Sequence, residues 1–392
     1  MKFYLILFYT SFLCSCNFFE SANPEVNYPP IWEYDFNIGY FSSIDPILYV
    51  DKVIYSGLDE KRKDFLANST LLAFDKENGI IKWDWSDTID PPDDKFHYES
   101  QYVVNNNQLF ISTGANYSID LQTGKTLFSD ENRDEPSGGL MFYNHKNMLY
   151  SSFRNELNTL IKYTDFDSFT WTTLFQVERN DSVAYTFYNI LPDTYQEQVL
   201  HFPITKYEND KLLPGIIKYD LNSNSIIKEK IIEVSESGRF IDNFSTIIDN
   251  KIFLPCNGIV ICVRSSDGEL IWETPVNGNT SRSGIMYADN KIFVNTEFQL
   301  YALDAETGNI LWQIDSSAGS RMQEHKGVVY YTDGISLRGV DAVSGEVLLE
   351  MEAPSRATDD GAFFQPVLTI DHENDRIYTA SYTHAYCYPT LR

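Results

Sequence analysis

The segment LYALDAETGNILW, residues 300–312, contains the pattern that decides the fold. A short apolar run leads to Asp304, a Thr-Gly pair follows, and a second apolar run ends at Trp312. Gly308 suits a tight turn because glycine reaches positive φ without strain, and the Asp304 carboxylate can accept N–H bonds across that turn. The segment therefore predicts a β-hairpin closed by a glycine turn.

Copies of this hairpin recur along the chain. The clearest are LAFDKENGIIKW (72–83) and CVRSSDGELIW (262–272), and weaker ones are SIDLQTGKTLF (118–128) and GVDAVSGEVLL (339–349). Two degenerate copies begin at Asp165 and Asp220. Aligned on the first Asp position, the copies start at 75, 120, 165, 220, 264, 304 and 341, so the spacing runs from 37 to 55 residues. A period of about 40–50 residues is typical of propeller blades of four strands.

A second hairpin with a polar tip precedes the glycine hairpins. Examples are Asp249-Asn250-Lys251, Asp289-Asn290-Lys291 and His325-Lys326-Gly327, each followed by an apolar run. Each unit therefore reads as strand, tight turn, strand, loop, strand, glycine turn and strand, which is one antiparallel blade.

The repeated motif resembles the tryptophan-docking repeat of PQQ-type propellers, and the resemblance covers nearly all of residues 31–392. It is strong in units one, five, six and seven, moderate in unit two and weak in units three and four. In that family the tryptophan packs between adjacent blades. The resemblance therefore implies structural docking by Trp32, Trp83, Trp272 and Trp312, with Gly79, Gly124, Gly268, Gly308 and Gly345 in the turns.

The two ends of the chain complete one blade together. Residues 31–36 look like an outer strand, and the C-terminus supplies only three strands, around 363–370, 376–381 and 383–388. Pairing the first strand with the last closes the ring and covers both edges. The sequence therefore predicts an all-β, eight-bladed β-propeller, with seven blades as the alternative if 139–235 holds one blade rather than two.

The N-terminus, MKFYLILFYTSFLCSC, has the features of an export signal. Lys2 precedes an apolar run of residues 3–13, which is too short to span a bilayer but suits a signal-peptide core. Leu13-Cys14-Ser15-Cys16 resembles the bacterial lipobox, which implies cleavage before Cys16 and its lipidation. An ordinary signal peptide with an incidental cysteine is the alternative. We expect a signal peptide at 1–15, a tether at 16–30 and the propeller at 31–392.

The residue after Cys16 bears on localisation. Asn17 is not the Asp that retains enteric lipoproteins at the inner membrane, which favours the outer membrane, with the protein facing the periplasm. Display at the cell surface stays open.

The acidic composition limits the classes of molecule that we expect the chain to bind. The net charge of −26 repels phosphate backbones, so we expect no nucleic-acid binding. The same charge favours basic partners. The alternative is that the acidic residues only form a solvated surface.

Cys256 and Cys262 flank a predicted turn at Asn257-Gly258. They stand about three rungs of the hairpin, or roughly 10 Å, apart, which is too far for a disulfide. We expect Cys256, Cys262 and Cys387 to be buried and free.

The long loops are the candidate binding face. Insertions at 58–70, 88–100, 129–137, 206–214 and 353–361 fall between second and third strands or between blades, on the face opposite the tight turns. Loops on a rigid scaffold often carry function, although neutral elaboration is the alternative. The acidic residues there form the binding hypothesis, with a basic peptide or protein as partner: Asp90, Asp93, Asp94, Asp130, Glu131, Asp134, Glu135, Asp359 and Asp360.

Catalytic and metal-binding motifs are missing from the sequence. There is no Gly-x-Ser-x-Gly, no His-Glu-x-x-His and no phosphate-binding glycine loop. The acidic runs at 371–375 and 220–224 begin like calcium loops but lack Gly at position six and Glu at position twelve. PQQ enzymes with similar repeats use adjacent cysteines near the cofactor, and no such pair occurs here. We therefore predict no cofactor and no metal.

These features favour a non-catalytic binding or scaffold lipoprotein with a monomeric propeller. By length, anchor and blade count the chain is similar to the propeller subunit of the outer-membrane barrel-assembly machinery, which implies a role in outer-membrane protein assembly. The alternative is a quinoprotein-related enzyme or a small-ligand or sugar-binding module that uses the propeller channel.

Overall fold

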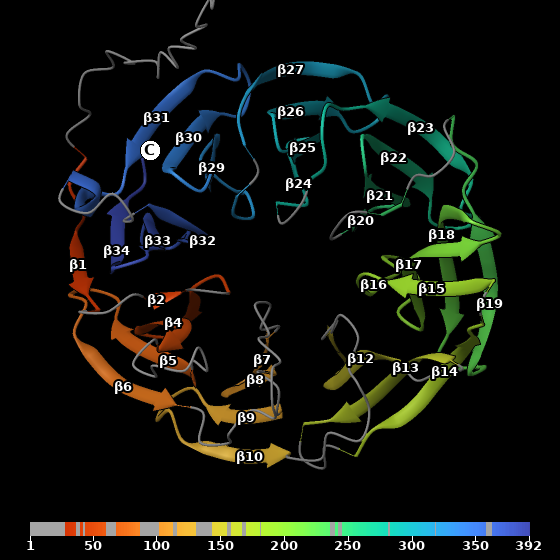
Figure 1. Cartoon of the computed structure of the whole chain (residues 1–392), viewed down its shortest axis with the longest axis horizontal. Helices are drawn as coiled ribbons and strands as arrows, with labels where there is room; N and C mark the ends of the chain where they lie inside the picture. Colours follow the sequence, from red (N-terminus) through yellow and green to blue (C-terminus); the bar gives the residue numbers. More distant parts are fainter. Residues whose placement is uncertain are drawn as a thin grey trace, which may run out of the picture.

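Eight antiparallel sheets stand around a ring in the computed structural model of the chain (Figure 1). The structure describes residues 28–36, 40–41, 44–59, 68–86, 102–112, 116–130, 143–154, 158–166, 170–180, 182–235, 240–241, 245–280, 283–317, 319–357 and 363–392. The predicted eight-bladed propeller is confirmed, and residues 139–235 hold two blades rather than one.

The first four blades follow the chain from Tyr40. Blade one contains β2 (Tyr40–Phe41), β3 (Ile47–Tyr49), β4 (Lys52–Asp59), β5 (Asn68–Asp75) and β6 (Ile81–Ser86). Blade two contains β7 (Tyr102–Asn105), β8 (Gln108–Ser112), β9 (Asn116–Asp120) and β10 (Thr126–Asp130). Blade three contains β11 (Tyr143–His145), β12 (Met148–Arg154), β13 (Asn158–Asp165) and β14 (Thr172–Glu178). Blade four contains β15 (Val183–Phe187), β16 (Leu191–Pro192), β17 (Val199–Glu208), β18 (Lys211–Asp220) and β19 (Ser225–Ile231).

The remaining four blades include the closing one. Blade five contains β20 (Thr246–Ile248), β21 (Lys251–Cys256), β22 (Ile259–Arg264) and β23 (Leu270–Pro275). Blade six contains β24 (Ile285–Ala288), β25 (Lys291–Asn295), β26 (Gln299–Asp304) and β27 (Ile310–Asp315). Blade seven contains β28 (Gln323–His325), β29 (Val328–Thr332), β30 (Ser336–Asp341) and β31 (Val347–Glu352). Blade eight joins β32 (Phe364–Asp371), β33 (Arg376–Ser381) and β34 (His384–Pro389) to β1 (Trp32–Asp35).

Ring closure joins the two ends of the chain as predicted. Trp32 lies opposite Cys387 and Asp35 opposite His384 in the antiparallel ladder of β1 and β34. The Ile31 amide N–H donates to the Cys387 carbonyl at 2.7 Å. Pairing the first strand with the last leaves no open end in the ring, which is how propellers protect their sheet edges.

A bulge lies beside the turn between the third and fourth strands in blades one to seven. The ladder between the third and fourth strands shifts there by one residue: in blade six Ala302 lies opposite Trp312, but Leu303 lies opposite Ile310. The same shift occurs at the corresponding pair in the other six of these blades. The extra residue re-aims the side chains of the outermost strand, so the bulge helps to set where the tryptophan points.

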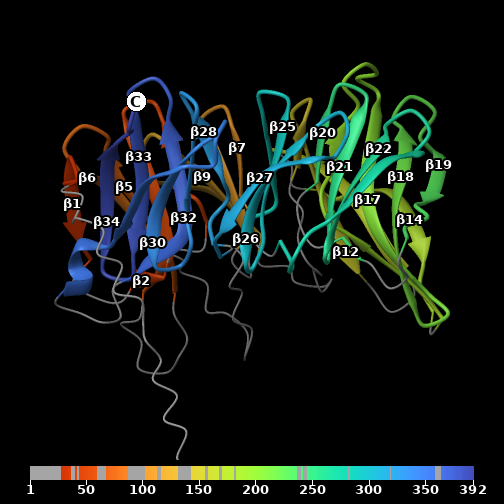
Figure 2. The same cartoon turned by 90° about the horizontal axis from the view of Figure 1, so that it is seen from above.

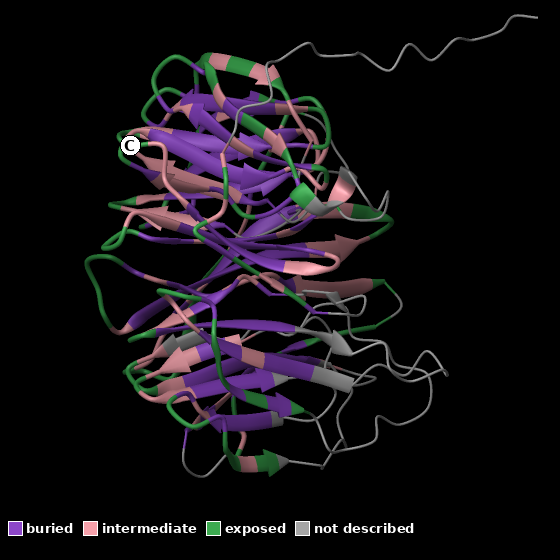
Figure 3. Ribbon diagram, turned by 90° about the vertical axis from the view of Figure 1, so that its left-hand side faces the viewer, coloured by how far each residue is buried: buried purple, intermediate pink, exposed green. Residues whose placement is uncertain are grey.

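The hydrophobic core lies between neighbouring blades. One cluster combines Phe253 and Trp272 of blade five with Ile292 and Leu303 of blade six. Figure 3 shows the buried strand segments inside the disc and the exposed turns on its faces. Each large apolar side chain buried in this way contributes on the order of 2–3 kcal/mol, so stacking the sheets stabilises the ring.

The turns divide between two faces, seen edge-on in Figure 2. The expected loop at 206–214 is wrong: β17 and β18 continue through it as a hairpin. Asn209 and Asp210 close that hairpin at φ 50° and 61°. Two consecutive residues at positive φ form the tight turn that suits long twisted strands, so this insertion extends the blade.

The cysteine geometry agrees with the sequence. Cys256 lies opposite Ile259, and Cys262 lies opposite Phe253. Cys256, Cys262 and Cys387 are buried and free, and burial raises the pKa of the Cys262 and Cys387 thiols to about 12.

No helix among the described residues is long and apolar enough to cross a membrane.

Candidate functional site

The docking tryptophans, Trp32, Trp83, Trp272 and Trp312, each lie against a turn glycine of the next blade. A Cβ on Gly308 would stand 2.6 Å from Cδ2 of Trp272, and one on Gly79 would stand 2.7 Å from Cε3 of Trp32. Trp83 meets Gly124, and Trp312 meets Gly345, in the same way. A side chain at the turn would collide with the indole, so glycine is needed for contact as well as for its positive φ.

Three of the docking tryptophans also donate a hydrogen bond to the next blade. The indole Nε1–H of Trp32 donates to the Lys76 carbonyl at 2.9 Å, and that of Trp272 to the Ala305 carbonyl at 3.3 Å. Trp83 donates to the Leu121 carbonyl at 3.2 Å. Each acceptor is the residue that directly follows the first position of the turn, so this carbonyl faces the docking position.

Gly268, the turn glycine of blade five, receives no tryptophan. In blade four Lys228 lies opposite Lys218 just before the bulge, the register that Trp83 and Ala73 have in blade one. Lys228 is exposed, and the stem of Lys230 lies against Gly268, with its Cγ 2.9 Å from where a Cβ would be. We call this place, between β18, β19 and the 264–268 turn, the vacant docking position.

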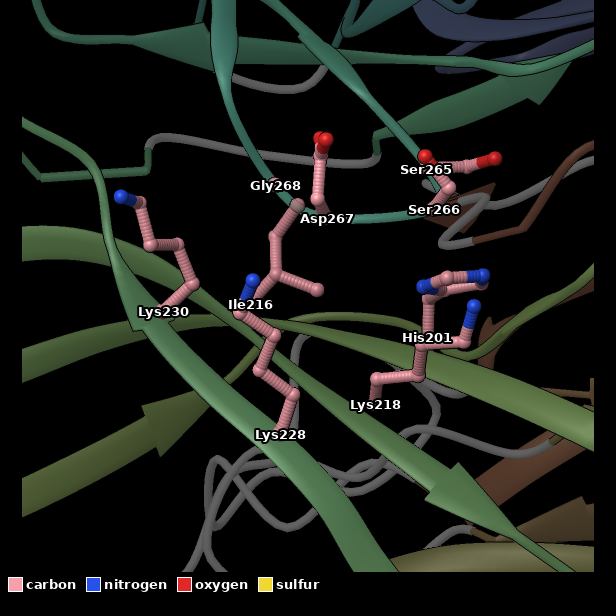
Figure 4. A pocket seen from close by; sticks show the side chains of 9 residues that line it. All are labelled: His201, Ile216, Lys218, Lys228, Lys230, Ser265, Ser266, Asp267 and Gly268. Atoms are coloured by element: carbon pink, nitrogen blue, oxygen red, sulfur yellow. The ribbon is translucent and has the colours of Figure 1, made fainter.

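A pocket occupies the vacant docking position (Figure 4). It holds about 230 Å³ of empty space, including its open mouth. Its lining residues come from blades four and five: His201, Ile216, Lys218, Lys228, Lys230, Ser265, Ser266, Asp267 and Gly268. Three lysines and a histidine therefore line one opening in a chain whose net charge is −26.

His201 is the buried polar group of the pocket. Its side chain is 0% exposed, and its Nε2 lies 2.9 Å from Oδ2 of Asp193. Burial lowers the pKa of His201 despite this carboxylate. Burial opposes ionisation of Asp193 too, but hydrogen bonds from His201 and from the Tyr195 and Gln196 amides together lower its pKa. The pair is therefore a neutral imidazole that donates Nε2–H to a carboxylate, and Nδ1 has no hydrogen-bond partner.

The lysines of the pocket differ in how far they are neutralised. Lys230 Nζ lies 2.9 Å from Oε1 of Glu269, and this bond raises the pKa of Lys230. Lys218 Nζ lies 3.8 Å from Oδ2 of Asp193. Lys228 makes no ion pair with any residue that the structure describes. Lys228 is therefore the pocket lysine without an ion-pair partner in the described part of the chain, and its ammonium group acts on the Asp267 carboxylate only at longer range.

The turn beside the pocket lacks its usual cap. In blade six Oδ1 of Asp304 accepts the amide N–H of Glu306 at 3.0 Å and of Thr307 at 2.8 Å. In blade five Arg264 replaces that Asp and pairs with Asp267 at 2.8 Å. The Ser266 and Asp267 amides thus have no acceptor within the described chain, and no indole donates to the Ser265 carbonyl.

The acidic residues predicted for the loop face lie mostly outside the described residues. Only Asp130 is placed, as the last residue of β10. The sequence analysis did not identify the pocket residues His201, Lys218, Lys228 and Lys230, although the spacing of the repeat could have pointed to Lys228. Lys228 stands eight residues after Asp220, as Trp83 stands eight after Asp75, so the degenerate repeat already marks a missing tryptophan.

The two acidic runs that begin like calcium loops serve as turn caps. Asp371 accepts the amide N–H of Glu373 and of Asn374, and Asp220 accepts that of Asn222. Among the described residues no group of three or more His, Cys, Asp or Glu side chains is placed to hold a metal ion.

Comparison with known proteins agrees with this architecture. Residues 239–388, which span blades five to eight, match the family model described as outer membrane protein assembly factor BamB. The crystal structure of BamB from Moraxella catarrhalis superposes with a TM-score of 0.62 at 11% identity, covering 93% of this chain and 98% of that one. No curated protein matches. The chain is a PQQ-like propeller similar to BamB, and the structural likeness at this identity is one of fold.

Proposed function

We propose that this PQQ-like propeller, similar to BamB, is a non-catalytic binding scaffold for outer-membrane protein assembly. The matched family is described as an outer membrane protein assembly factor, which supports that role. In this proposal residues 1–15 are a signal peptide, and Cys16 carries the lipid anchor. Residues 16–30 then tether the propeller to the periplasmic side of the outer membrane.

The observation that carries the proposal is the free edge of the outermost strands. β19, β23 and β27 each end their sheet, so one side of each strand has no strand partner among the residues that the structure describes. Figure 1 shows these strands on the circumference of the ring. An extended segment of another protein can add to such an edge through main-chain hydrogen bonds.

Exposed aliphatic side chains accompany these edges, and we call them the rim pairs. They are Ile226–Ile227 on β19, Leu270–Ile271 on β23 and Ile310–Leu311 on β27. Ile271 is 38% exposed and Leu311 is 48% exposed. Apolar groups beside a free backbone edge suit a partner strand with alternating apolar side chains, which is the sequence pattern of outer-membrane β-barrels.

A holdase assay tests the proposal. A urea-denatured outer-membrane barrel protein is diluted into buffer with the purified propeller, and its aggregation is followed by light scattering. We expect the wild type to suppress aggregation and the Ile271→Lys/Leu311→Lys variant to need at least fivefold more protein for the same effect. Val343→Lys is the matched control, because Val343 is 71% exposed but lies in a turn of blade seven rather than on an outer strand.

Two results would argue against the proposal. If the wild type leaves aggregation unchanged, the chain does not bind unfolded barrel proteins. If the Ile271→Lys/Leu311→Lys variant acts like wild type, the rim pairs are not the binding surface. Anchoring is tested separately by metabolic labelling with radioactive palmitate, which Cys16→Ser should abolish.

The acidic loop residues proposed from the sequence form a second part of this hypothesis. Neutralising Asp90, Asp93 and Asp94 to Asn should weaken capture of a basic partner. Since charge–charge attraction is screened by salt, the effect should shrink as the ionic strength rises.

A further inference from the structure

We infer that the vacant docking position between blades four and five binds a small oxyanion of the phosphate type, held by Lys218, Lys228 and the buried His201. This site is independent of the rim pairs and of the proposed scaffold role.

The balance of charges around the pocket leaves cations in excess. Each nearby carboxylate already has a cationic partner: Asp267 has Arg264 at 2.8 Å, Glu269 has Lys230 at 2.9 Å and Asp193 has Lys218 at 3.8 Å. Lys228 has none, and in Figure 4 its side chain extends from β19 toward the turn that carries Asp267 and Gly268. Ammonium groups near a charged oxygen form charge-assisted hydrogen bonds, the strong kind.

His201 adds an unsatisfied atom that a ligand would pair. Buried polar side-chain atoms nearly always have a hydrogen-bond partner, and His201 Nδ1 is buried without one. Its ring lines the pocket beside Lys218 (Figure 4). Because Nε2–H donates to Asp193, Nδ1 presents a lone pair, which can accept the P–OH hydrogen of a monoprotonated phosphate while the charged oxygens face the lysines.

The turn of blade five supports the same class of ligand. The Ser266 and Asp267 amides have no capping carboxylate, because Arg264 stands where the turn of blade six has Asp304. They are therefore donors without a described acceptor, on residues that line the pocket. Backbone N–H groups in a turn commonly complete anion sites together with lysine.

The size of the space excludes a replacement indole. At the four docking positions that hold a tryptophan, the ring lies over the turn glycine. Here the Lys230 stem fills that place, with Cβ and Cγ at 3.1 and 2.9 Å from a Cβ on Gly268. What remains is a small opening among polar groups, which suits a few heavy atoms with several acceptors.

Isothermal titration of the full lipidated chain in detergent tests the site. The probe is inorganic phosphate at pH 7, with chloride used to hold the ionic strength constant. We expect saturable binding that Lys228→Gln weakens at least tenfold. Lys125→Gln is the control, because Lys125 is an exposed lysine in the glycine turn of blade two. Absence of saturable binding up to 20 mM phosphate, or equal binding by wild type and Lys228→Gln, would overturn the inference.

A double substitution that places a tryptophan in the vacant docking position distinguishes loss of the anion site from loss of the fold. Lys228→Trp/Lys230→Thr copies Trp272 and Thr274 of blade five into blade four at the same register. We expect it to abolish phosphate binding while the melting temperature stays equal or rises, since an indole would then dock on Gly268. Retained phosphate binding in this variant would place the ion elsewhere and contradict the assignment.

A further titration identifies the source of the oxyanion. Short-chain phosphatidic acid, a phosphate monoester, is titrated below its micelle concentration into the same proteins. If it binds tighter than inorganic phosphate and Lys228→Gln removes the difference, a lipid headgroup is the source; if it binds equally or more weakly, a free ion is. Both results support the site, whereas phosphatidic acid binding that Lys228→Gln leaves unchanged counts against it.

Discussion

The indole of Trp272 packs on the backbone of Gly308 in the next blade, and the distance leaves no room for a Cβ between them. The Nε1–H of the same indole donates to Ala305 in that turn, and the Thr274 hydroxyl donates to the Gly308 carbonyl at 2.6 Å. One blade thus holds its neighbour through an apolar contact and two hydrogen bonds. Substituting the turn glycine therefore tests directly how much the contact between blades contributes to stability.

Replacing this glycine should destabilise the ring through two separable effects. Gly308→Ala should lower the free energy of unfolding by roughly 2–5 kcal/mol, since a positive φ costs a side chain about 1–2 and overpacking costs about 1–3. Gly334→Ala isolates the first effect, because Gly334 has φ 85° but nothing within 4 Å of a Cβ. Urea denaturation of both variants is the measurement. Equal losses would show that the Trp272 contact contributes nothing.

The hydrogen bonding of the indole N–H groups predicts that two docking tryptophans differ in how much stability their replacement costs. Trp272 Nε1 has an acceptor, but Trp312 Nε1 is buried without one in the described structure. Trp272→Phe removes a hydrogen bond and should cost about 1–2 kcal/mol more than Trp312→Phe, which removes an unsatisfied donor. Thermal unfolding of the two variants measures the gap. A larger loss for Trp312→Phe would mean that its indole finds an acceptor in solution.

Ring closure predicts the effect of shortening the N-terminus. Deleting residues 1–36 removes β1, so β34 loses its ladder partner and Gly79 loses Trp32. We expect the melting temperature to fall and the protein to self-associate, because the uncovered β34 edge can pair with another chain. Size-exclusion chromatography over a range of concentrations detects this. Deleting only residues 1–27 keeps every described contact and should leave a stable monomer; a stable monomer from the longer deletion would refute the closure argument.

The buried His201–Asp193 pair predicts an acid-sensitive stability. Asp193 and Lys218 face His201, and Lys228 and Asp267 line the same pocket. Burial keeps the folded pKa of His201 below the ordinary value near 6.5. The unfolded chain therefore binds a proton that the folded chain lacks, so stability falls as the pH decreases below about 6.5. The lowered pKa of Asp193 adds a further loss as the pH falls below its ordinary value near 4.

A glutamine at position 201 removes the contribution of the histidine to this dependence of stability on pH. His201→Gln can still donate to Asp193 but does not titrate, so the urea midpoint should fall less between pH 7 and pH 5 than in wild type. His384→Gln, in blade eight, controls for loss of a histidine elsewhere. The account fails if wild type and His201→Gln show parallel pH profiles.

Much of the fold could be predicted from the sequence because it is built from local signals. Asp304, Gly308 and Trp312 lie within nine residues, and a turn glycine and a capping Asp act over that distance through the backbone alone. Recurrence of the hairpin then implies a ring, since a single blade cannot bury both of its apolar faces. The split closing blade followed from counting three strands at one end and one at the other.

The vacant docking position depends on contacts that the order of residues along the chain does not reveal. His201, Lys228 and Gly268 stand far apart in sequence and meet only because blade four stacks on blade five. The sequence by itself determined the repeated hairpin and its glycine turns, because propensity and periodicity are local properties. Only the tertiary structure decided that eight blades close the ring and that the buried His201 lines the position where Lys228 stands in place of a tryptophan, because packing between blades is a long-range property.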